Sequence, residues 1–384
     1  MSLIPELTSA ERNRYARHLV LPEIGEAGQL KLKSARVVIV GLGGLGSPAA
    51  LYLAAAGVGT LGLIDDEIVE LSNLQRQVLH ASSAEGTPKV QSAAERLKAL
   101  NPEIRIEAKQ VRMTSANALN LLRGFDIVID GSDNLPTRYL VNDACALLGL
   151  PDVYGSVIGF EGQLSVFDAS RGPCYRCLYP NPPQPGSVRS CAEAGVLGGQ
   201  TGVIGTLQSI EALKMILGEG EPLIGRVLLF DSLTARFDEM RLQKDVNCAL
   251  CGTHPSIHDL RDYEAFCSHN GGRGISMEST FSAISVHQLK QKIEKGEKVF
   301  LLDVREPYEY KVANLSGHLI PLGQLADRVH ELDPEREIVV YCHHGNRSAF
   351  AVQFLKNQGF ESVVNLAGGI DAWSQEVDPS LPRY

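Results

Sequence analysis

Short apolar runs rich in β-branched residues alternate with helical patterns from residue 1 to about residue 255. Such runs predict buried strands of a parallel sheet, whereas apolar residues spaced three and four apart predict amphipathic helices. The predicted strands are RVVIV, TLGLID, IRIEAK, DIVID and GQLSVFD, and helices between them include SPAALYLAAAG and KVQSAAERLKAL. Strand–helix alternation indicates an α/β fold with a doubly wound, mainly parallel sheet. Its default ligand site is the crevice at the carboxyl ends of the strands.

The composition changes near residue 268, where SHNGGRGISMEST is rich in glycine and small polar residues and has no apolar periodicity. This stretch predicts a linker. Beyond it, VFLLDV, EIVVYC and SVVNLAGG alternate with helical segments, which predicts a second and smaller α/β domain. We therefore predict an N-terminal domain over residues 1–255, a linker over 256–277 and a C-terminal domain over 278–384.

Residues 37–64 carry no charge and are long enough to suggest a membrane span. Seven glycines and Pro48 interrupt the run, so it predicts a strand, a glycine turn, a helix and a second strand instead. The net charge of -9 argues against broad binding to nucleic acid or anionic membranes. The first residues lack a basic segment followed by an apolar one, so no secretory signal is predicted and we expect a cytoplasmic protein.

The segment VVIVGLGGLG places Gly41, Gly43 and Gly46 in the spacing G-x-G-x-x-G directly after a predicted strand. This is the fingerprint of a Rossmann-like nucleotide-binding turn. Asp65 ends the next strand about twenty residues further on, where a carboxylate can accept hydrogen bonds from ribose hydroxyls. These features fit NAD and ATP equally well.

Cationic residues near the second strand favour ATP. A triphosphate requires several cationic donors and Mg²⁺. Arg76 and Lys89 follow that strand, and Arg17 lies near the start of the chain. Asp133, in DGSDN at the end of a later strand, is a candidate ligand for Mg²⁺. The alternative for each residue is an ordinary solvated surface charge.

Several motifs occur in order over about residues 10–250: GLGGLGSPAALYLAAAGVG, LSNLQRQVLH, PKVQSA, DGSDNLPTRY and EGQLSVF. In order and spacing they resemble the MoeB/ThiF family, the bacterial relatives of ubiquitin-activating enzymes. The resemblance implies an enzyme that adenylates the C-terminal Gly-Gly carboxylate of a small ubiquitin-like sulfur carrier of the MoaD/ThiS kind. The positions it implies for ATP and Mg²⁺ are Gly41, Gly43, Gly44, Asp65, Asn73, Arg76, Lys89, Asp133 and Asn134. It also implies a homodimer in which Arg17 reaches the ATP site of the partner.

Four of the eight cysteines form two C-x-x-C pairs. Cys174 and Cys177 lie in CYRC, and Cys248 and Cys251 lie in CALC. Two such pairs match a tetrahedral Cys₄ zinc site, although either pair alone is compatible with a redox motif. The predicted zinc is structural because four thiolates leave no open position, and the family resemblance implies the same metal.

Cys191 lies in RSCAEAGVLGG, after the proline-rich segment PNPPQPGSV. A cysteine in an ordinary context packs as a small hydrophobic residue. Here the context resembles the family's cysteine that accepts a thioester or persulfide on a crossover loop, which implies a catalytic role. Cys145 and Cys267 have no such context and are predicted to be core or surface residues.

Cys342 lies in VVYCHHGNRSAFAVQFLKNQGF, where a strand is predicted to end at Tyr341 and a helix to begin near Ser348. The six residues C-H-H-G-N-R between them predict a loop whose backbone N–H groups point inward. Such a nest at a helix N-terminus stabilises an anion and activates a thiol. Arg347 adds a positive charge, so Cys342 and Arg347 are candidate catalytic residues.

LLDVREPYEY, GHLIPLG, CHHGNRS and NLAGGIDAW, in this order, resemble a single rhodanese domain. The six-residue loop matches sulfur-handling rhodaneses, because related phosphatases use a longer one. The resemblance implies a persulfide on Cys342, supplied by a donor such as a cysteine desulfurase. Asp303 and Arg305 are predicted to hold the loop.

The two predicted domains complement each other, since one activates a carboxylate as an acyl-adenylate and the other delivers sulfur. Together they predict conversion of a carrier's carboxylate to a thiocarboxylate. Three rival interpretations remain. An NAD-dependent oxidoreductase explains the glycines but not the cations or the rhodanese domain. A non-enzymatic scaffold requires an inactive pocket. An adenylating biosynthetic enzyme acting on a peptide or small acid, with the rhodanese domain as an accessory, is harder to distinguish from an enzyme that activates a carrier.

Overall fold

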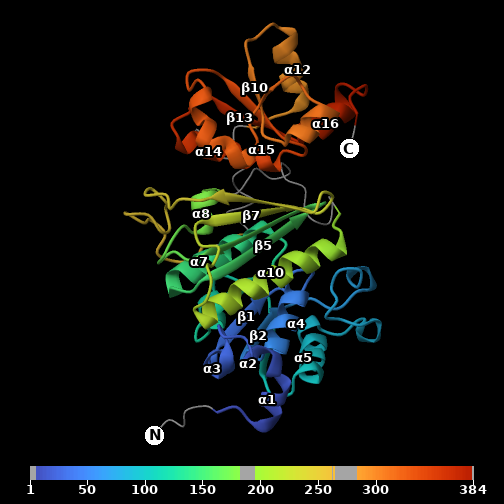
Figure 1. Ribbon diagram of the computed structural model, residues 1–384, viewed down its shortest axis with the longest axis vertical. Helices are drawn as coiled ribbons and strands as arrows, with labels where there is room; N and C mark the ends of the chain where they lie inside the picture. The colour runs from blue at the N-terminus through green and yellow to red at the C-terminus, as the bar shows by residue number, and fades with distance from the viewer. Residues whose placement is uncertain (1–5, 182–194, 262, 264–282, 383–384) are drawn as a thin grey trace. The chain divides into compact units, whose positions relative to one another are not determined.

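The computed structural model describes residues 6–181, 195–261, 263 and 283–382 (Figure 1). It divides the chain into two compact units, Met1–Arg273 and Gly274–Tyr384. Most of the predicted linker lies outside the described residues, so its limits and the domain limits stay predictions.

The first unit contains an eight-stranded sheet in the order β3-β2-β1-β4-β5-β6-β7-β8. Strands β1 to β5 pair in parallel, and β6 to β8 continue the sheet in antiparallel pairs. The strands are β1 Arg36–Val40, β2 Thr60–Asp65, β3 Arg105–Gln110, β4 Ile127–Asp130, β5 Asp152–Ile158, β6 Glu161–Phe167, β7 Arg226–Asp231 and β8 Arg236–Arg241. The predicted mainly parallel α/β fold is confirmed.

Helices surround this sheet and bury its central strands. Its described α-helices are α1 Ser9–Arg14, α2 Ala16–Leu19, α3 Gly25–Ser34, α4 Gly46–Ala56, α5 Lys89–Leu100, α6 Ala118–Leu122, α7 Leu135–Leu148, α8 Tyr175–Leu178 and α10 Gly198–Leu217. Two 3₁₀ turns, η1 Leu71–Asn73 and η2 Ser82–Ala84, lie between β2 and α5. Helix α10 packs against α4 and across β5 and β6.

The uncharged segment 37–64 forms β1, the glycine turn, α4 and β2, as predicted. Val37, Ile39, Leu61 and Leu63 belong to one apolar core with the inner face of α4. Among the residues that the model describes, no helix combines the length and apolarity needed to cross a bilayer.

The second unit contains a five-stranded parallel sheet in the order β11-β10-β12-β13-β9. Alternate residues of β12 enter separate apolar clusters, with Val340 in one and Val339 in the other, so the sheet is buried on both faces. The strands are β9 Ala283–Ile284, β10 Phe300–Asp303, β11 His318–Leu319, β12 Ile338–Tyr341 and β13 Val363–Leu366. The helices are α12 Val286–Glu294, α13 Pro307–Val312, α14 Leu325–Arg328, α15 Asn346–Asn357 and α16 Gly369–Glu376, with 3₁₀ turns η3 Leu322–Gln324 and η4 Val329–Glu331.

Candidate functional site

The glycine turn joins the carboxyl end of β1 to the start of α4. Gly41 has a φ of +86°, which L-residues with a side chain rarely adopt. A Cβ on Gly46 would lie 1.9 Å from the carbonyl oxygen of Gly41, so this position excludes any larger residue. A Cβ on Gly43 would meet only Gln77, at an ordinary 3.7 Å. Internal packing therefore does not require a glycine at position 43. A glycine there leaves the backbone open to close approach by a ligand.

Asp65 is bound to the glycine turn through its carboxylate. One oxygen accepts a hydrogen bond from the backbone N–H of Leu42 at 2.7 Å, and the other accepts from that of Glu67 at 2.8 Å. Burial raises the pKa of Asp65, while the two backbone hydrogen bonds oppose this rise. The carboxylate thus fixes the position of β2 relative to the turn at the carboxyl edge of the sheet.

The ends of three adjacent strands place these groups together. Val40 of β1 pairs with Ile64 of β2 on one side and with Asp130 of β4 on the other. The glycine turn and Asp65 follow directly, and Asp133 follows β4 as an exposed residue. Asn134 caps α7 by accepting a hydrogen bond from the backbone N–H of Thr137 at 3.0 Å. This arrangement is the switch point of a doubly wound sheet.

Two cationic candidates follow β2. Lys89 is the first residue of α5 and is buried, and its ammonium lies 2.5 Å from the carboxylate of exposed Glu67. Arg76 follows η1 and donates to the carbonyl of Ser72 at 3.1 Å. The side-chain oxygen of buried Asn73 accepts from the backbone N–H of Glu70 at 3.3 Å. The partly exposed side chain of Arg76 can turn towards a ligand. The side chain of Lys89 is buried at the start of α5 and paired with Glu67.

Two residues predicted to act in the first unit are not placed with the glycine turn and the residues around it. Arg17 lies on the short helix α2 and is exposed, and it remains a prediction that it acts on a partner subunit. Cys191, like Cys267, lies outside the described residues. Its predicted catalytic role stays a prediction.

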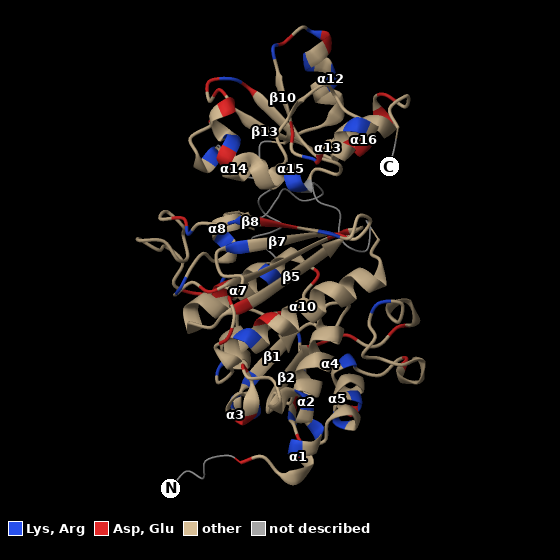
Figure 2. Cartoon of the chain, in the orientation of Figure 1, with Lys and Arg blue, Asp and Glu red and all other residues tan. Residues whose placement is uncertain are grey.

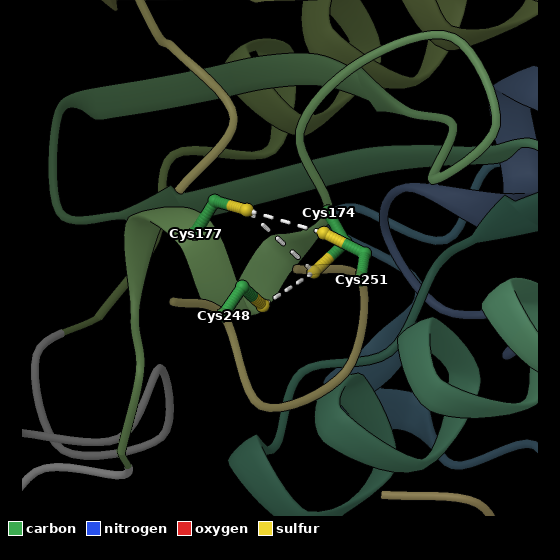
Figure 3. Close-up of side chains that lie close together, drawn as sticks. All are labelled: Cys174, Cys177, Cys248 and Cys251. Carbon is green, nitrogen blue, oxygen red and sulfur yellow. Dashed lines mark hydrogen bonds between the residues drawn. The ribbon is translucent and has the colours of Figure 1, made fainter. Parts of the chain in front are cut away.

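The four cysteines of the C-x-x-C pairs form one cluster (Figure 3). Their Sγ atoms all lie within 4.8 Å of one another, with separations of 3.9 Å for Cys174–Cys177, 3.6 Å for Cys174–Cys248 and 3.4 Å for Cys177–Cys251. A tetrahedron with Zn–S bonds of about 2.3 Å has S–S edges of about 3.8 Å. The cluster can therefore hold a metal ion.

Neighbouring side chains orient the first cysteine pair from inside the protein. Arg176, between the two cysteines of CYRC, donates two hydrogen bonds of 2.8 Å to the fully buried carboxylate of Asp143 on α7. Tyr263 donates a third bond to the same carboxylate at 2.6 Å. The side-chain oxygen of Asn142 accepts from the backbone N–H of Tyr175 at 2.7 Å. These contacts fix the CYRC turn on α7 independently of any metal.

Cys342 follows β12 in the second unit, and its sulfur is the centre of a small hydrogen-bonded loop. The backbone N–H of Gly345 lies 3.1 Å from Sγ, and the hydroxyl of Ser348 lies 3.3 Å from it. Gly345 has a φ of +95° and precedes α15, which begins at Asn346. The helix therefore begins two residues before the predicted Ser348, because the left-handed glycine starts it earlier. Both donors favour a thiolate or a terminal persulfide sulfur.

The positive charge of Arg347 is paired with a carboxylate near the Cys342 loop. Arg347 forms a bidentate ion pair with Glu309 of α13, with both N–O distances 2.7 Å. Burial raises the pKa of Glu309, but the hydrogen bonds and charge of Arg347, the backbone N–H of Glu306 and the charge of Arg305 together outweigh it, and the pKa is lowered. Arg347 thus holds the loop against α13.

Asp303 and Arg305 form a second ion pair, fully buried, at the base of the loop. Arg305 donates to Asp303 at 2.6 Å and to the carbonyl of Ala313 at 2.8 Å. Asp303 pairs with Tyr341 in the sheet, directly before Cys342. This placement agrees with the scaffold role expected from the sequence.

Comparisons with known proteins agree with this geometry. The ThiF family model matches residues 15–250, and a rhodanese-like domain model matches residues 285–376. The chain belongs to the ThiF family. Two relatives are named for both adenylyltransferase and sulfurtransferase activities. Adenylyltransferase and sulfurtransferase MOCS3 of Drosophila yakuba is 44% identical over 99% of this chain and 86% of that protein. The probable adenylyltransferase/sulfurtransferase MoeZ of Mycobacterium tuberculosis is 43% identical over 98% of this chain and 96% of that protein.

Solved structures of similar fold cover about two thirds of this chain. E. coli MccB has a TM-score of 0.57 and 23% identity over 66% of this chain and 76% of that chain. PaaA has a TM-score of 0.54 and 22% identity over 64% of this chain and 77% of that chain. At these identities the likeness supports the fold alone.

Sequence reasoning missed the acidic partners of two candidate cations. Glu67 pairs with Lys89, and Glu309 pairs with Arg347. Glu309 lies three residues after Glu306 in a capping box at the start of α13, which is a local signal for a helix start but not for its ion pair.

Proposed function

We propose that this chain adenylates the C-terminal Gly-Gly carboxylate of a small ubiquitin-like sulfur carrier and then converts it to a thiocarboxylate. The observation that carries the proposal is the meeting of the glycine turn, Asp65 and Asp133 at the carboxyl ends of adjacent strands, with Lys89 nearby. The rhodanese-like unit supplies a sulfur-binding loop in the same chain.

In this proposal the nucleotide lies over the glycine turn. Asp65 accepts hydrogen bonds from the ribose, the backbone at Gly43 approaches the phosphates, and Arg76 and Lys89 neutralise them. Asp133, with adjacent Asn134, provides oxygen ligands suited to Mg²⁺, which would neutralise phosphate charge when bound.

The first reaction is substitution at phosphorus. A carrier carboxylate oxygen bonds to the α-phosphorus of ATP, and the bond from that phosphorus to the bridging oxygen breaks, releasing pyrophosphate. The carrier is then a mixed anhydride with AMP. The protein contributes position and charge neutralisation more than covalent chemistry.

The second reaction delivers sulfur from Cys342. The terminal persulfide sulfur attacks the carrier's carbonyl carbon and AMP leaves, which gives an acyl disulfide on Cys342. We assign Cys191 as the thiol that attacks the Cys342 sulfur, which releases the thiocarboxylate and leaves a Cys191–Cys342 disulfide. Two equivalents of an external thiol then reduce that disulfide and are themselves joined as a disulfide, and a protein persulfide such as that of a cysteine desulfurase transfers its outer sulfur to Cys342 and leaves as a thiol.

An exposed apolar cluster supports docking of a folded carrier. Phe160 in the β5–β6 turn and Leu233 and Phe237 in the β7–β8 hairpin all have large exposed side chains. Ser232 joins the two segments by donating from its N–H and hydroxyl to the carbonyl of Phe160, each at 3.0 Å. A small ubiquitin-like protein with an apolar face suits this surface.

A second apolar surface supports a homodimer. Helices α4 and α10 are tan over most of their length in Figure 2, because α4 has no charged residue and α10 has only Glu211 and Lys214. A shallow groove between them is lined by Pro48, Tyr52, Val203 and Leu207, among others. Burial of this face against a second copy removes it from water, and Arg17 would then act on the partner's nucleotide.

We further propose that the cysteine cluster holds zinc. Four thiolates in tetrahedral spacing favour zinc, and their full coordination leaves no position for substrate. Its role is to join the end of the first unit to α8 and α7.

The deciding experiment is ATP–pyrophosphate exchange with and without a carrier ending in Gly-Gly, followed by intact-mass analysis of the carrier in the presence of a persulfide donor. The proposal expects carrier-dependent exchange and replacement of one oxygen by sulfur, lost in Cys342→Ala while exchange persists. A carrier without its last glycine is the control. Exchange that needs no carrier would favour action on a small acid, and no exchange with any carrier would refute the adenylation.

A further inference from the structure

The peptide groups flanking Leu42, inside the glycine turn, are bound on two sides. The N–H of Leu42 donates to Asp65 at 2.7 Å. Its carbonyl oxygen lies 3.2 Å from Nε2 of His80 and 3.2 Å from the hydroxyl of Ser47. Leu42 is fully buried and His80 nearly so. The direction of the turn therefore depends on side chains from β2, from α4 and from the segment that follows η1.

The hydrogen-bonding partners of His80 define its proton. A carbonyl oxygen only accepts hydrogen bonds, so Nε2 of His80 carries hydrogen. Burial lowers the pKa of His80, which favours the neutral ring. Nδ1 is then an acceptor, and the hydroxyl of Ser92 lies 3.0 Å from it. One neutral tautomer satisfies both contacts.

Ser92 belongs to the first turn of α5, the helix that begins at Lys89. His80 therefore connects two separate elements, the backbone of the glycine turn and the helix that carries the buried ammonium. A triphosphate held by the turn and by Lys89 requires a fixed spacing between them, because a displacement of about 1 Å in a binding site is costly.

We propose that His80 is a positioning residue that fixes the spacing between the glycine turn and Lys89 and thereby sets the affinity for MgATP. This inference rests on the proposed function and adds to it a residue that touches no substrate. Its role is separate from that of Asp65, which binds the N–H of Leu42 in the preceding peptide group.

Two substitutions of similar size test the contact. In His80→Gln the side-chain amide reaches as far as Nε2 and can still donate to Leu42, whereas the shorter amide of His80→Asn cannot. We expect His80→Asn to raise the dissociation constant for MgATP about tenfold, as expected for loss of one buried hydrogen bond. His80→Gln, which keeps the contact with Leu42 but not the one with Ser92, should restore part of the affinity. Ser92→Ala, which breaks the connection at its other end, is a second variant in case His80→Asn does not fold.

The measurement is calorimetric titration of the full chain with MgATP, with melting temperatures taken in parallel. Gln91→Ala, at an exposed position of the same helix turn, is the matched control and should bind normally. The nitrogen chemical shifts of His80 should show a proton on Nε2. Equal affinity in the unmodified chain, His80→Asn and Ser92→Ala would overturn this inference alone. Absence of MgATP binding by the unmodified chain would overturn the proposed function as well.

Discussion

The ammonium of Lys89 and the carboxylate of Glu67 lie 2.5 Å apart, yet the Lys89 side chain is 3% exposed and that of Glu67 is 68% exposed. In the proposed ATP complex, Glu67 and the nucleotide phosphates would compete for this buried cation. We expect Glu67→Gln to tighten MgATP binding several-fold, because the phosphates no longer displace a carboxylate. Without nucleotide the variant should be less stable, since a buried ammonium loses its partner.

Titration with MgATP and thermal melting with and without it measure both effects. Asp66→Asn removes a neighbouring exposed charge and is the matched control, with little expected change in either. Unchanged affinity for MgATP in Glu67→Gln would contradict the prediction, because it would show that the Glu67–Lys89 ion pair does not weaken nucleotide binding.

The cysteine cluster joins segments 74 residues apart, as between Cys174 and Cys248. We expect one zinc ion per chain, and its removal by a chelator or by Cys248→Ser should destabilise the first unit by about 4 kcal/mol, the order of the entropy of closing a loop of that length. Metal analysis and urea unfolding measure this. Cys145→Ser, outside the cluster, should keep its zinc. A metal-free chain with unchanged stability would contradict the prediction.

Glu309 and Arg347 are mostly buried, with side-chain exposures of 3% and 13%. Either Glu309→Leu or Arg347→Met should cost about 3–5 kcal/mol because a mostly buried charge loses its bidentate partner, and the double variant should cost less than the sum. Sulfur transfer should fall in both single variants, because the loop at Cys342 loses its attachment to α13.

Fluorescence of Trp373, the only tryptophan of the chain, follows unfolding of the second unit in these variants. Arg328→Gln breaks an exposed pair with Glu331 in the same unit and should have little effect. Additive costs in the double variant would show that the pair is not coupled.

Local sequence was enough to predict the strands and helices around the glycine turn. Helix α5 spans Lys89–Leu100, the predicted KVQSAAERLKAL, because its apolar spacing is strong and Pro88 precedes it. Strands β5, β7 and β8 were not predicted. In β8, RFDEMR alternates partly buried and exposed residues and has no apolar run, so only its pairing with β7 makes it a strand.

Some residues of the candidate site could likewise be predicted from the sequence, and others could not. Asp65 and Asp133 were predictable because strand ends and motif order place them at one edge. The partners of the cations were not, because Glu67 and Lys89 are 22 residues apart and Glu309 and Arg347 are 38 apart. Pairing at such distances depends on tertiary packing.

The stability of the second unit should depend on pH through His343, which follows Cys342. Burial, together with the charge of neighbouring His344, lowers the pKa of His343 to about 4 from an ordinary 6.5. Well above pH 6.5 the ring is neutral in both the folded and the unfolded chain, so its titration does not change the free energy of unfolding. As the pH falls from about 6.5 to about 4, the unfolded chain binds a proton that the folded chain does not. The second unit should therefore lose up to about 3 kcal/mol of stability across this window.

Urea unfolding followed by Trp373 fluorescence at pH 7.5 and pH 5 measures this loss. His343→Gln should remove most of the pH dependence, since its amide does not titrate. His287→Gln is the control, because His287 is exposed beside Glu376 and its substitution should leave the dependence in place. The same pH dependence in His343→Gln and in the unmodified chain would show that another group is responsible. If His343 is responsible, the sulfur loop is held by packing around a neutral ring and loosens when that ring must accept a proton.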